Sequence, residues 1–239
     1  MLAVEGLNAW WGHAQALFDV HLQVGEGELV VLQGLNGAGK STLLQSLIGI
    51  GPRVQGRIVW DGQRIDTWPA HRRARAGLGY VAEDRRLFTG LTVEENLWIV
   101  ARAAGQARTR QRYQQVLDLF PQLQAMLQRP ASQMSGGEQQ MLALARTLMT
   151  DPRLLLLDEP CEGIAPVLVA AMRDALLQLA GQGMTLLVAE QNHILAAHAH
   201  RVLTLSSGRL ARASETVCRQ SAPDGGTTFR RSMVNGGEG

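Results

Sequence analysis

The chain has 239 residues, of which 46% are hydrophobic, so one sizeable core or two smaller ones can be buried. The 23 basic and 21 acidic residues give a formal net charge of +2, and this near balance argues against a nucleic-acid-binding role, which requires a clustered basic surface. Cys161 and Cys218 are too few for a disulfide scaffold, the start of the chain lacks a secretory pattern, and no apolar stretch approaches the length of a membrane span. We therefore expect a soluble protein of a reduced cytoplasmic compartment, which reaches a membrane only through a partner.

The first predicted elements form the start of an α/β unit. Leu17–Val24 alternates between apolar and polar residues, and Leu29–Leu32 is a short apolar run, so both are predicted to be strands. A glycine-rich loop, Gly34–Gly39, then leads into a helix with apolar residues at helical spacing. A strand, a glycine loop and a helix in this order are typical of a parallel α/β sheet. Arg57–Trp60 is predicted to be a further strand, followed by a turn.

The second half of the chain alternates helices with apolar strands. Pro121, Pro130 and the glycine pair at 136–137 divide a helical region that is rich in glutamine and arginine. After Ala213 the hydrophobicity falls, and the polar segment 213–239 is expected to be a flexible tail. The predicted elements, in order, are helices Val93–Ala104, Arg110–Phe120 and Gln139–Met149, strand Leu154–Leu157, helix Pro166–Ala180, strand Thr185–Ala189, a helix near Ile194–His200 and strand Val202–Leu205.

Positions 34–41 match the phosphate-binding pattern G-x-x-x-x-G-K-[ST] in full, between a strand and a helix. The glycines allow successive backbone N–H groups to face an anion, and the positive end of the following helix points at the same place. Lys40 is the single lysine among the 23 basic residues, and its ammonium is predicted to bridge the β- and γ-phosphates of ATP while the Ser41 hydroxyl ligates Mg²⁺. The predicted nucleotide-binding residues of this loop are Gly34, Asn36, Gly37, Ala38, Gly39, Lys40, Ser41 and Thr42.

Two carboxylates follow the apolar strand at 154–157. Ligands of open α/β sheets bind beyond the carboxyl ends of the strands, where Asp158 and Glu159 are expected. Asp158 is predicted to hold Mg²⁺, directly or through water, and Glu159 to accept a proton from, or to orient, the water that attacks the γ-phosphate. A solvated acidic turn is the alternative, but the phosphate-binding loop earlier in the chain favours the catalytic interpretation.

A second glycine-rich helix start lies at Ser135-Gly136-Gly137-Glu138, shortly before the acidic strand end. Ser135 is a good N-cap, and the glycines leave the first backbone N–H groups accessible to an anion. A single ATP site needs only one such helix start. A merely capped helix after a flexible turn is the alternative interpretation.

These three motifs together resemble the ATP-binding cassette (ABC) family, whose signature motif reads Leu-Ser-Gly-Gly-Gln where this chain has Met134 to Glu138. The resemblance covers about residues 3–212. It implies a P-loop NTPase fold of the ABC ATPase type, α/β with a mixed or parallel core sheet, an antiparallel β subdomain and an α-helical signature subdomain. The expected organisation is an ABC ATPase domain over 1–212, a helical subdomain inserted at about 84–150, and the tail over 213–239. The family also implies that Ser135, Gly136, Gly137 and Glu138 close over ATP held by another subunit.

Further positions follow from this resemblance one at a time. Trp11 matches the aromatic residue that stacks on adenine, although a buried tryptophan at a strand end is the alternative. Glu83 stands where the family usually has a glutamine that senses Mg²⁺ and the membrane subunit. Gln191 stands where most members have a histidine that contacts the γ-phosphate; an amide can donate there but cannot take up a proton. Ala165 replaces an aspartate that couples the two sites. These departures affect catalytic control rather than ATP binding.

The departures resemble the ATPases of branched-chain amino acid importers, in the segments 80–97, 135–143 and 190–192. That subgroup implies a second ABC ATPase subunit in a hetero- or homodimer, transmembrane permease subunits, a periplasmic solute-binding protein, no nucleic acid, and a place on the cytoplasmic face of the inner membrane. The related urea and short-amide importers are the alternative. A soluble non-transport cassette and a P-loop kinase are further alternatives. The stretch Arg85–Leu91, with Leu87 and Phe88, is predicted either to receive a helix of the membrane subunit or to pack in the core.

Overall fold

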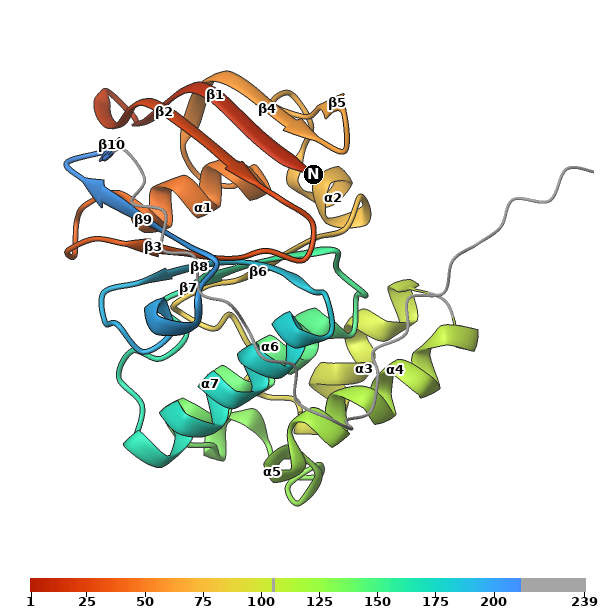
Figure 1. Cartoon of the computed structure of the whole chain (residues 1–239). Helices are drawn as coiled ribbons and strands as arrows, with labels where there is room; N and C mark the ends of the chain where they lie inside the picture. The colour runs from red at the N-terminus through yellow and green to blue at the C-terminus, as the bar shows by residue number, and fades with distance from the viewer. Residues whose placement is uncertain (105, 212–239) are drawn as a thin grey trace, which may run out of the picture.

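The computed structural model describes residues 1–104 and 106–211 (Figure 1). The predicted tail at 213–239 lies outside these described residues. Two sheets organise the described chain: a four-stranded sheet in the order β2-β1-β4-β5, and a six-stranded sheet in the order β10-β9-β3-β8-β7-β6. This two-sheet α/β arrangement is the predicted fold class.

The four-stranded sheet is antiparallel throughout. The predicted strand Leu17–Val24 is confirmed and begins earlier, because the whole segment pairs with the N-terminal strand. That N-terminal strand was not predicted. It lacks clean alternation since its register shifts several times along its pairing with β2. The strands of this sheet are β1 (Leu2–Trp11), β2 (Ala14–Val24), β4 (Arg53–Trp60) and β5 (Gln63–Arg64).

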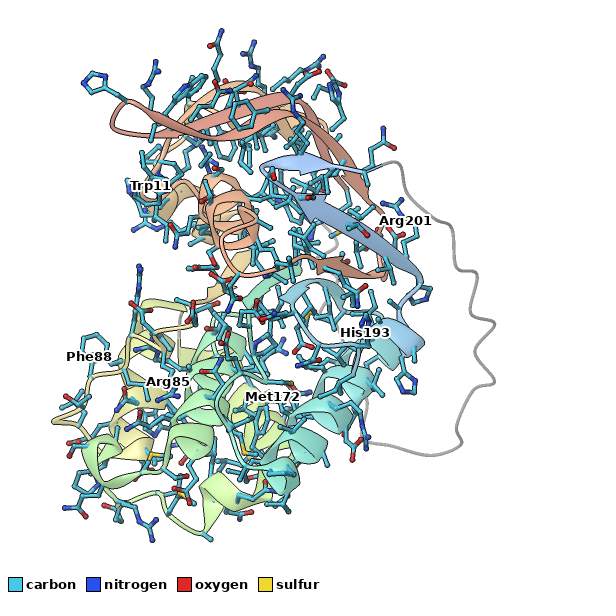
Figure 2. All side chains as sticks on the ribbon, turned by 90° about the vertical axis from the view of Figure 1, so that its left-hand side faces the viewer. Trp11, Arg85, Phe88, Met172, His193 and Arg201 are labelled. Carbon is cyan, nitrogen blue, oxygen red and sulfur yellow. The ribbon has the colours of Figure 1, made fainter. Side chains whose placement is uncertain are left out.

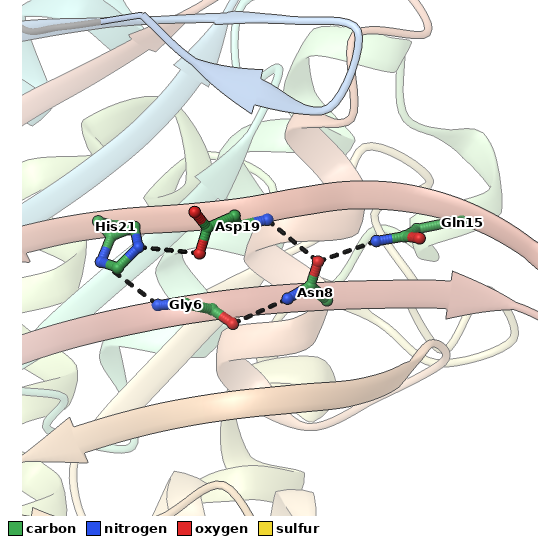
Figure 3. Close-up of polar contacts among 5 residues, drawn as sticks. All are labelled: Gly6, Asn8, Gln15, Asp19 and His21. Carbon is green, nitrogen blue, oxygen red and sulfur yellow. Dashed lines mark hydrogen bonds and ion pairs between the residues drawn. The ribbon is translucent and has the colours of Figure 1, made fainter.

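Polar side chains occupy the irregular part of the β1–β2 pairing (Figure 3). The Asn8 amide oxygen accepts from Gln15 Nε2 at 2.9 Å and from the Asp19 N–H at 3.1 Å, and the Asn8 amide donates to the Gly6 carbonyl at 3.0 Å. His21 accepts from the Gly6 N–H at 3.4 Å and contacts Asp19 Oδ1 at 3.0 Å. These contacts supply partners for backbone groups where the shifted register disturbs the regular ladder.

The six-stranded sheet is parallel except for β10, which pairs antiparallel with β9 at one edge. Its central strands are buried on both faces, as the continuous apolar runs at Leu29–Leu32, Leu154–Leu157 and Thr185–Ala189 predict. The strands are β3 (Leu29–Gln33), β6 (Leu78–Val81), β7 (Leu154–Asp158), β8 (Thr185–Glu190), β9 (Arg201–Ser206) and β10 (Arg209–Leu210).

Two hydrophobic cores lie on opposite faces of this sheet. One joins the sheet to α1 and the antiparallel sheet, and the other joins it to the helices below it in Figure 1. The helices of 93–148 stand between β6 and β7 in the sequence; their division into a separate subdomain stays a prediction. The helices are α1 (Lys40–Ile48), α2 (Ala70–Arg75), α3 (Val93–Ala104), α4 (Gln106–Leu119), α5 (Pro121–Gln124), α6 (Gly136–Leu148) and α7 (Pro166–Gly181).

The helix predicted near Ile194–His200 is wrong. Only a 3₁₀ turn, Ala196–His198, forms there. Leu195 and Ala199 are buried at helical spacing, which explains the prediction. His200 instead exchanges two hydrogen bonds with Leu29 of β3, at 2.9 and 3.0 Å, and this long-range pairing draws the segment into the start of β9. Among the described helices, none combines the length and hydropathy that crossing a membrane requires.

Candidate functional site

The loop at 34–39 joins β3 to α1, and its backbone requires glycine at particular positions. Gly37 and Gly39 have φ of 79° and 105°, a region that favours glycine. At Gly34 a Cβ would lie 2.4 Å from the Leu205 carbonyl oxygen of β9, so no larger residue fits there. Gly39 is the N-cap of α1 and offers no side-chain cap. The first N–H groups of α1 therefore face the loop without a side-chain partner, as an anion site requires.

The Lys40 ammonium is buried against this loop. It donates to the carbonyls of Gly34 at 2.6 Å and Leu35 at 3.1 Å, and it forms an ion pair with Glu159 Oε1 at 3.0 Å. Only 4% of the Lys40 side chain and 7% of the Glu159 side chain are exposed. The pair therefore joins the glycine loop to the acidic end of β7 within a region of low solvent access.

A second contact joins the same two elements. The Ser41 hydroxyl donates to Asp158 Oδ1 at 2.9 Å, across 117 residues of sequence. The Tyr80 hydroxyl of β6 donates to Asp158 Oδ2 at 3.1 Å. Burial raises the pKa of Asp158 to about 6, against the opposing effect of these two hydrogen bonds. Tyr80 was not predicted as a site residue; the signal that the sequence offers is its place near the end of a strand, three residues before the predicted Glu83.

Glu159 is held from both sides of its carboxylate. Its Oε2 accepts from the Gln191 N–H at 3.1 Å, and its own N–H donates to the Ala189 carbonyl at 2.9 Å. Its φ of 47° lies in the left-handed region, which is uncommon outside glycine. The end of β8 thus fixes the backbone and one carboxylate oxygen of Glu159, while Lys40 contacts the other oxygen.

A cavity of about 690 Å³ opens over the glycine loop. It brings together eight of the predicted site residues with several that were not predicted. The predicted ones are Asn36, Gly37, Gly39, Lys40, Ser41, Thr42, Glu83 and Glu159, and the others are Gln15, Ala16, Phe18, Glu162, Ser207 and Gly208. Asp158 does not line the cavity and reaches it through the Ser41 hydroxyl.

Trp11 lies beside this cavity without lining it. Its indole N–H donates to the Thr42 hydroxyl at 3.2 Å, and 47% of its surface is exposed. The ring covers Gly51, where a Cβ would lie 2.4 Å from the indole. Trp11 is therefore a half-exposed aromatic residue at the strand end, attached to α1, and its predicted stacking on adenine stays a prediction.

Gln191 lines a different hollow, of about 440 Å³, on another side of the glycine loop. Gly34 and Ala38 belong to this hollow and not to the larger cavity. His193 also lines it and contacts Gln33 of β3, with 2.6 Å between the ring Nδ1 and the amide nitrogen. Figure 2 shows His193 on the side of the molecule opposite Trp11 and Phe88. The predicted contact of the Gln191 side chain with a γ-phosphate stays a prediction.

The second glycine-rich helix start forms a complete capping box. Ser135 accepts from the Glu138 N–H at 3.4 Å, and Glu138 Oε2 accepts from the Ser135 N–H at 2.7 Å. The backbone hydrogen bond from Ser135 lowers the pKa of Glu138. This cap starts α6 at Gly136, three residues before the predicted helix. Of the described residues around the two hollows, none comes from Ser135–Glu138.

Gly137 marks a close approach between two helices. A Cβ there would lie 2.4 Å from Leu168 of α7, so the start of α6 packs directly against that helix.

The glycine loop, the buried ammonium and the serine–aspartate contact at the carboxyl edge of a parallel sheet define a P-loop nucleotide-binding protein.

Comparisons with known proteins identify the family within this class. The sequence model of the family described as ABC transporter matches residues 17–162. The high-affinity branched-chain amino acid transport ATP-binding protein BraG of Pseudomonas aeruginosa is 41% identical over 211 residues, 88% of this chain and 91% of that protein. The probable branched-chain amino acid transport ATP-binding protein LivF of Archaeoglobus fulgidus is 37% identical over 193 residues, 80% of this chain and 82% of that protein.

Solved structures agree with the sequence relatives. A structure described as the ATP binding subunit of an ABC transporter has a TM-score of 0.78 at 29% identity and covers 90% of each chain. The cassette MJ0796, solved as a dimer in a post-hydrolysis state with ADP and phosphate, has a TM-score of 0.81 at 24% identity, over 90% of this chain and 98% of that chain, and shows the same fold. The chain belongs to the ABC transporter family and is an ATPase of its ATP-binding-cassette type.

Proposed function

We propose that this protein is the ATP-hydrolysing subunit of an importer for branched-chain or other hydrophobic amino acids. The observation that carries the hydrolytic part is the buried Lys40–Glu159 pair, which joins the phosphate-binding loop to a carboxylate within one cavity. The solute is inferred from the relatives, because BraG and LivF, both named for branched-chain amino acid transport, share 41% and 37% identity with this chain. The glutamate/aspartate import protein GltL of Escherichia coli shares 33%.

The residues around the cavity divide the chemistry between them. The uncapped N–H groups of α1 and the Lys40 ammonium bind the phosphates of ATP, and the phosphates replace the loop carbonyls as partners of the ammonium. Glu159, held at both carboxylate oxygens, accepts the proton of the attacking water. Backbone groups of β8 hold Glu159 on one side, and they keep one of its oxygens in place when Lys40 turns to the phosphates.

The donors at Asp158 fit a magnesium ion. Its carboxylate and the Ser41 hydroxyl lie 2.9 Å apart at the edge of the cavity, and such hard oxygen donors are the ones Mg²⁺ prefers together with phosphate oxygens. When bound, Mg²⁺ neutralises the charge that develops on the phosphates. Glu83 lines the same cavity and is the third proposed member of this group.

The site is completed by a second cassette. Ser135–Glu138 lies outside the cavity of its own chain, and yet it presents a glycine-rich helix start suited to an anion. We assign it to the ATP held by a partner ATPase subunit, identical or different, so that ATP joins the two subunits. The permease subunits, a periplasmic binding protein and the cytoplasmic face of the inner membrane follow from the importer assignment.

Phe88 is the proposed contact with the permease. It is 48% exposed, whereas its neighbour Leu87 packs against the helical core, so Phe88 is the large apolar side chain that this stretch exposes (Figure 2). Phe88→Ala should lower solute transport several-fold while ATP binding is unchanged, and Ile99→Ala, which truncates another exposed apolar side chain, serves as the control. Equal loss of transport and of ATP binding in Phe88→Ala would contradict the assignment.

The solute is tested on the complete assembly in liposomes. The ATPase rate is measured with the binding protein loaded in turn with leucine, isoleucine, valine, glutamate or urea. Stimulation by the branched-chain amino acids supports the proposal. Stimulation by urea alone would assign the chain to the urea and short-amide importers, and failure to co-purify with any permease would favour a soluble cassette.

A further inference from the structure

Glu190, the last residue of β8, is a buried carboxyl group outside the machinery described so far. Its exposed fraction is 0%, and neither of its oxygens has a hydrogen-bond partner of normal geometry within the described chain. Leu186 and Val188 of the same strand belong to the core shared with the helices, whereas Leu187 and Ala189 belong to the core on the α1 face. Strand alternation therefore directs Glu190 toward the helical core, away from the phosphates.

The groups that surround Glu190 come from three elements. Glu159 and Cys161 approach from the turn after β7, and both influence its pKa. Gln33 is its partner in the register of β3 and contacts His193 from the loop after β8. None of these described side chains forms an ion pair with it. A buried carboxylate without a cation is strongly disfavoured, so an uncharged acid fits this position.

Burial is the largest cause that raises the pKa of Glu190 to about 7, and the Glu159 charge raises it further, while the thiol and amide of Cys161 lower it. Burial and the carboxylates nearby also raise the pKa of the Cys161 thiol, which therefore stays protonated. Glu190 is consequently neutral below about pH 7 and gains a charge above it.

The backbone around Glu190 is the frame that holds Glu159. The residue before it, Ala189, accepts from the Glu159 N–H, and the residue after it, Gln191, donates to the Glu159 carboxylate. On the far side, Cys161 lies two residues after Glu159 in the same turn. A displacement of Glu190 away from Cys161 therefore disturbs the hydrogen bonds of both the backbone N–H and the carboxylate of Glu159.

We propose that Glu190 is a positioning residue, whose uncharged carboxyl group packs the end of β8 against the Cys161 turn and thereby aligns Glu159 with the attacking water. The proposal rests on the role proposed above for Glu159. A charge on Glu190 repels Glu159 and draws water toward the buried turn, which loosens the alignment. The expected signature is a fall in kcat as the pH rises through neutrality, with KM for ATP unchanged, because the phosphate contacts lie on the other face of the sheet.

The first experiment compares the pH profiles of the complete assembly with wild-type subunit and with Glu190→Gln, which has the same shape and cannot ionise. The ratio of kcat at pH 8.5 to kcat at pH 6.5 should rise at least threefold in Glu190→Gln. Glu5→Gln, which removes an exposed carboxylate, is the matched control and should keep the wild-type ratio. An unchanged ratio in Glu190→Gln, or a loss equal at every pH, would overturn the proposal.

A second variant leaves Glu190 in place. Cys161→Ala removes a thiol that lowers the pKa of Glu190, so the fall in kcat should move to higher pH, while Cys161→Ser should stay nearer to wild type. An unmoved fall in Cys161→Ala also overturns the proposal. Glu159→Gln separates the two claims. If Glu159→Gln still hydrolyses ATP, the role of Glu159 fails. If Glu159→Gln is inactive, but the pH profiles of Glu190→Gln and Cys161→Ala match the wild-type profile, only the positioning role of Glu190 is refuted.

Discussion

The two glycine-rich helix starts of this protein differ in how their backbone N–H groups are satisfied. At α1 the N-cap is Gly39 and no side chain caps the helix. At α6 the N-cap is Ser135, and Ser135 and Glu138 satisfy each other's N–H groups in a capping box. The first helix start is therefore open to an anion within its own chain, whereas the second is stable by itself.

The charges around the two helix starts follow the same division. A buried lysine and the end of β7 surround the first, so an anion bound there would meet a cation. The second carries the acidic Glu138 in its first turn, with Arg129 3.8 Å away. The first helix start is thus left open to an anion, whereas the second is satisfied within its own chain, as we expect if its proposed ligand is held by a partner subunit.

The largest expected effect is at the first helix start. Lys40→Ala should lower ATP hydrolysis ~100-fold or more, because it removes the cation that faces the phosphates and leaves Glu159 buried without its partner. ATPase assays and nucleotide-binding titrations measure this. Arg57→Ala, which breaks an exposed pair with Glu5, is the control and should retain activity. Hydrolysis at a normal rate in Lys40→Ala would refute the assignment of the ATP phosphates to the first helix start.

Glu159→Gln should separate binding from hydrolysis. The amide cannot take the proton of the attacking water, so turnover should fall ~100-fold or more while ATP still binds, and an ATP-dependent dimer should accumulate. Size-exclusion chromatography with light scattering, in the presence and absence of ATP and with the partner subunit added, measures the dimer. A monomer under all of these conditions would argue against the assignment of the second helix start to a neighbouring nucleotide.

The next prediction concerns the acidic residue of the second helix start. Glu138→Gln retains an oxygen that can accept from the Ser135 N–H, but it removes a negative charge from the proposed phosphate-facing end of α6. In the Glu159→Gln background, the ATP concentration required for dimerisation should therefore fall several-fold. Glu94→Gln changes a carboxylate at the start of another helix and is the matched control. A requirement for more ATP would indicate that Glu138 aids closure.

Local sequence rules predicted most of the framework. The helix Val93–Ala104 has the predicted bounds, and the apolar run Leu154–Leu157 forms the central strand β7 with one further residue. Apolar runs and periodicity are properties of neighbouring residues, so they can be read from the sequence. The strand Leu2–Trp11 was missed because its bulges break the alternation of apolar and polar residues. The turn at Ala196–His198 was wrongly predicted as a helix because its conformation depends on hydrogen bonds between His200 and the distant strand β3.

The site was predictable by residue type more than by geometry. The motifs assigned both Ser41 and Asp158 to Mg²⁺, and the structure brings the hydroxyl and the carboxylate to 2.9 Å from each other. No local pattern indicates that Tyr80 donates to the same carboxylate, or that Glu190 is buried beside Cys161, because these relations arise from strand order. The family resemblance assigned Gln191 to the phosphates, but a resemblance does not say on which side of the glycine loop the amide lies.

The smallest expected effect tests the claim that the second helix start is stable by itself. Ser135→Ala removes the oxygen that accepts from the Glu138 N–H, and loss of such a cap costs about 1 kcal/mol of unfolding free energy. Denaturant melts of the isolated chain at pH 7 should show this loss with or without ATP.

The Glu138 half of the capping box adds a pH dependence to the stability. The pKa of Glu138 is lowered in the fold, so its contribution is complete above the unfolded pKa and is lost as the pH falls through the folded pKa. Wild type and Glu138→Gln should therefore converge in stability as the pH falls through the lowered pKa of Glu138. A loss in Ser135→Ala that appears only with ATP present would instead mean that the cap forms together with the nucleotide.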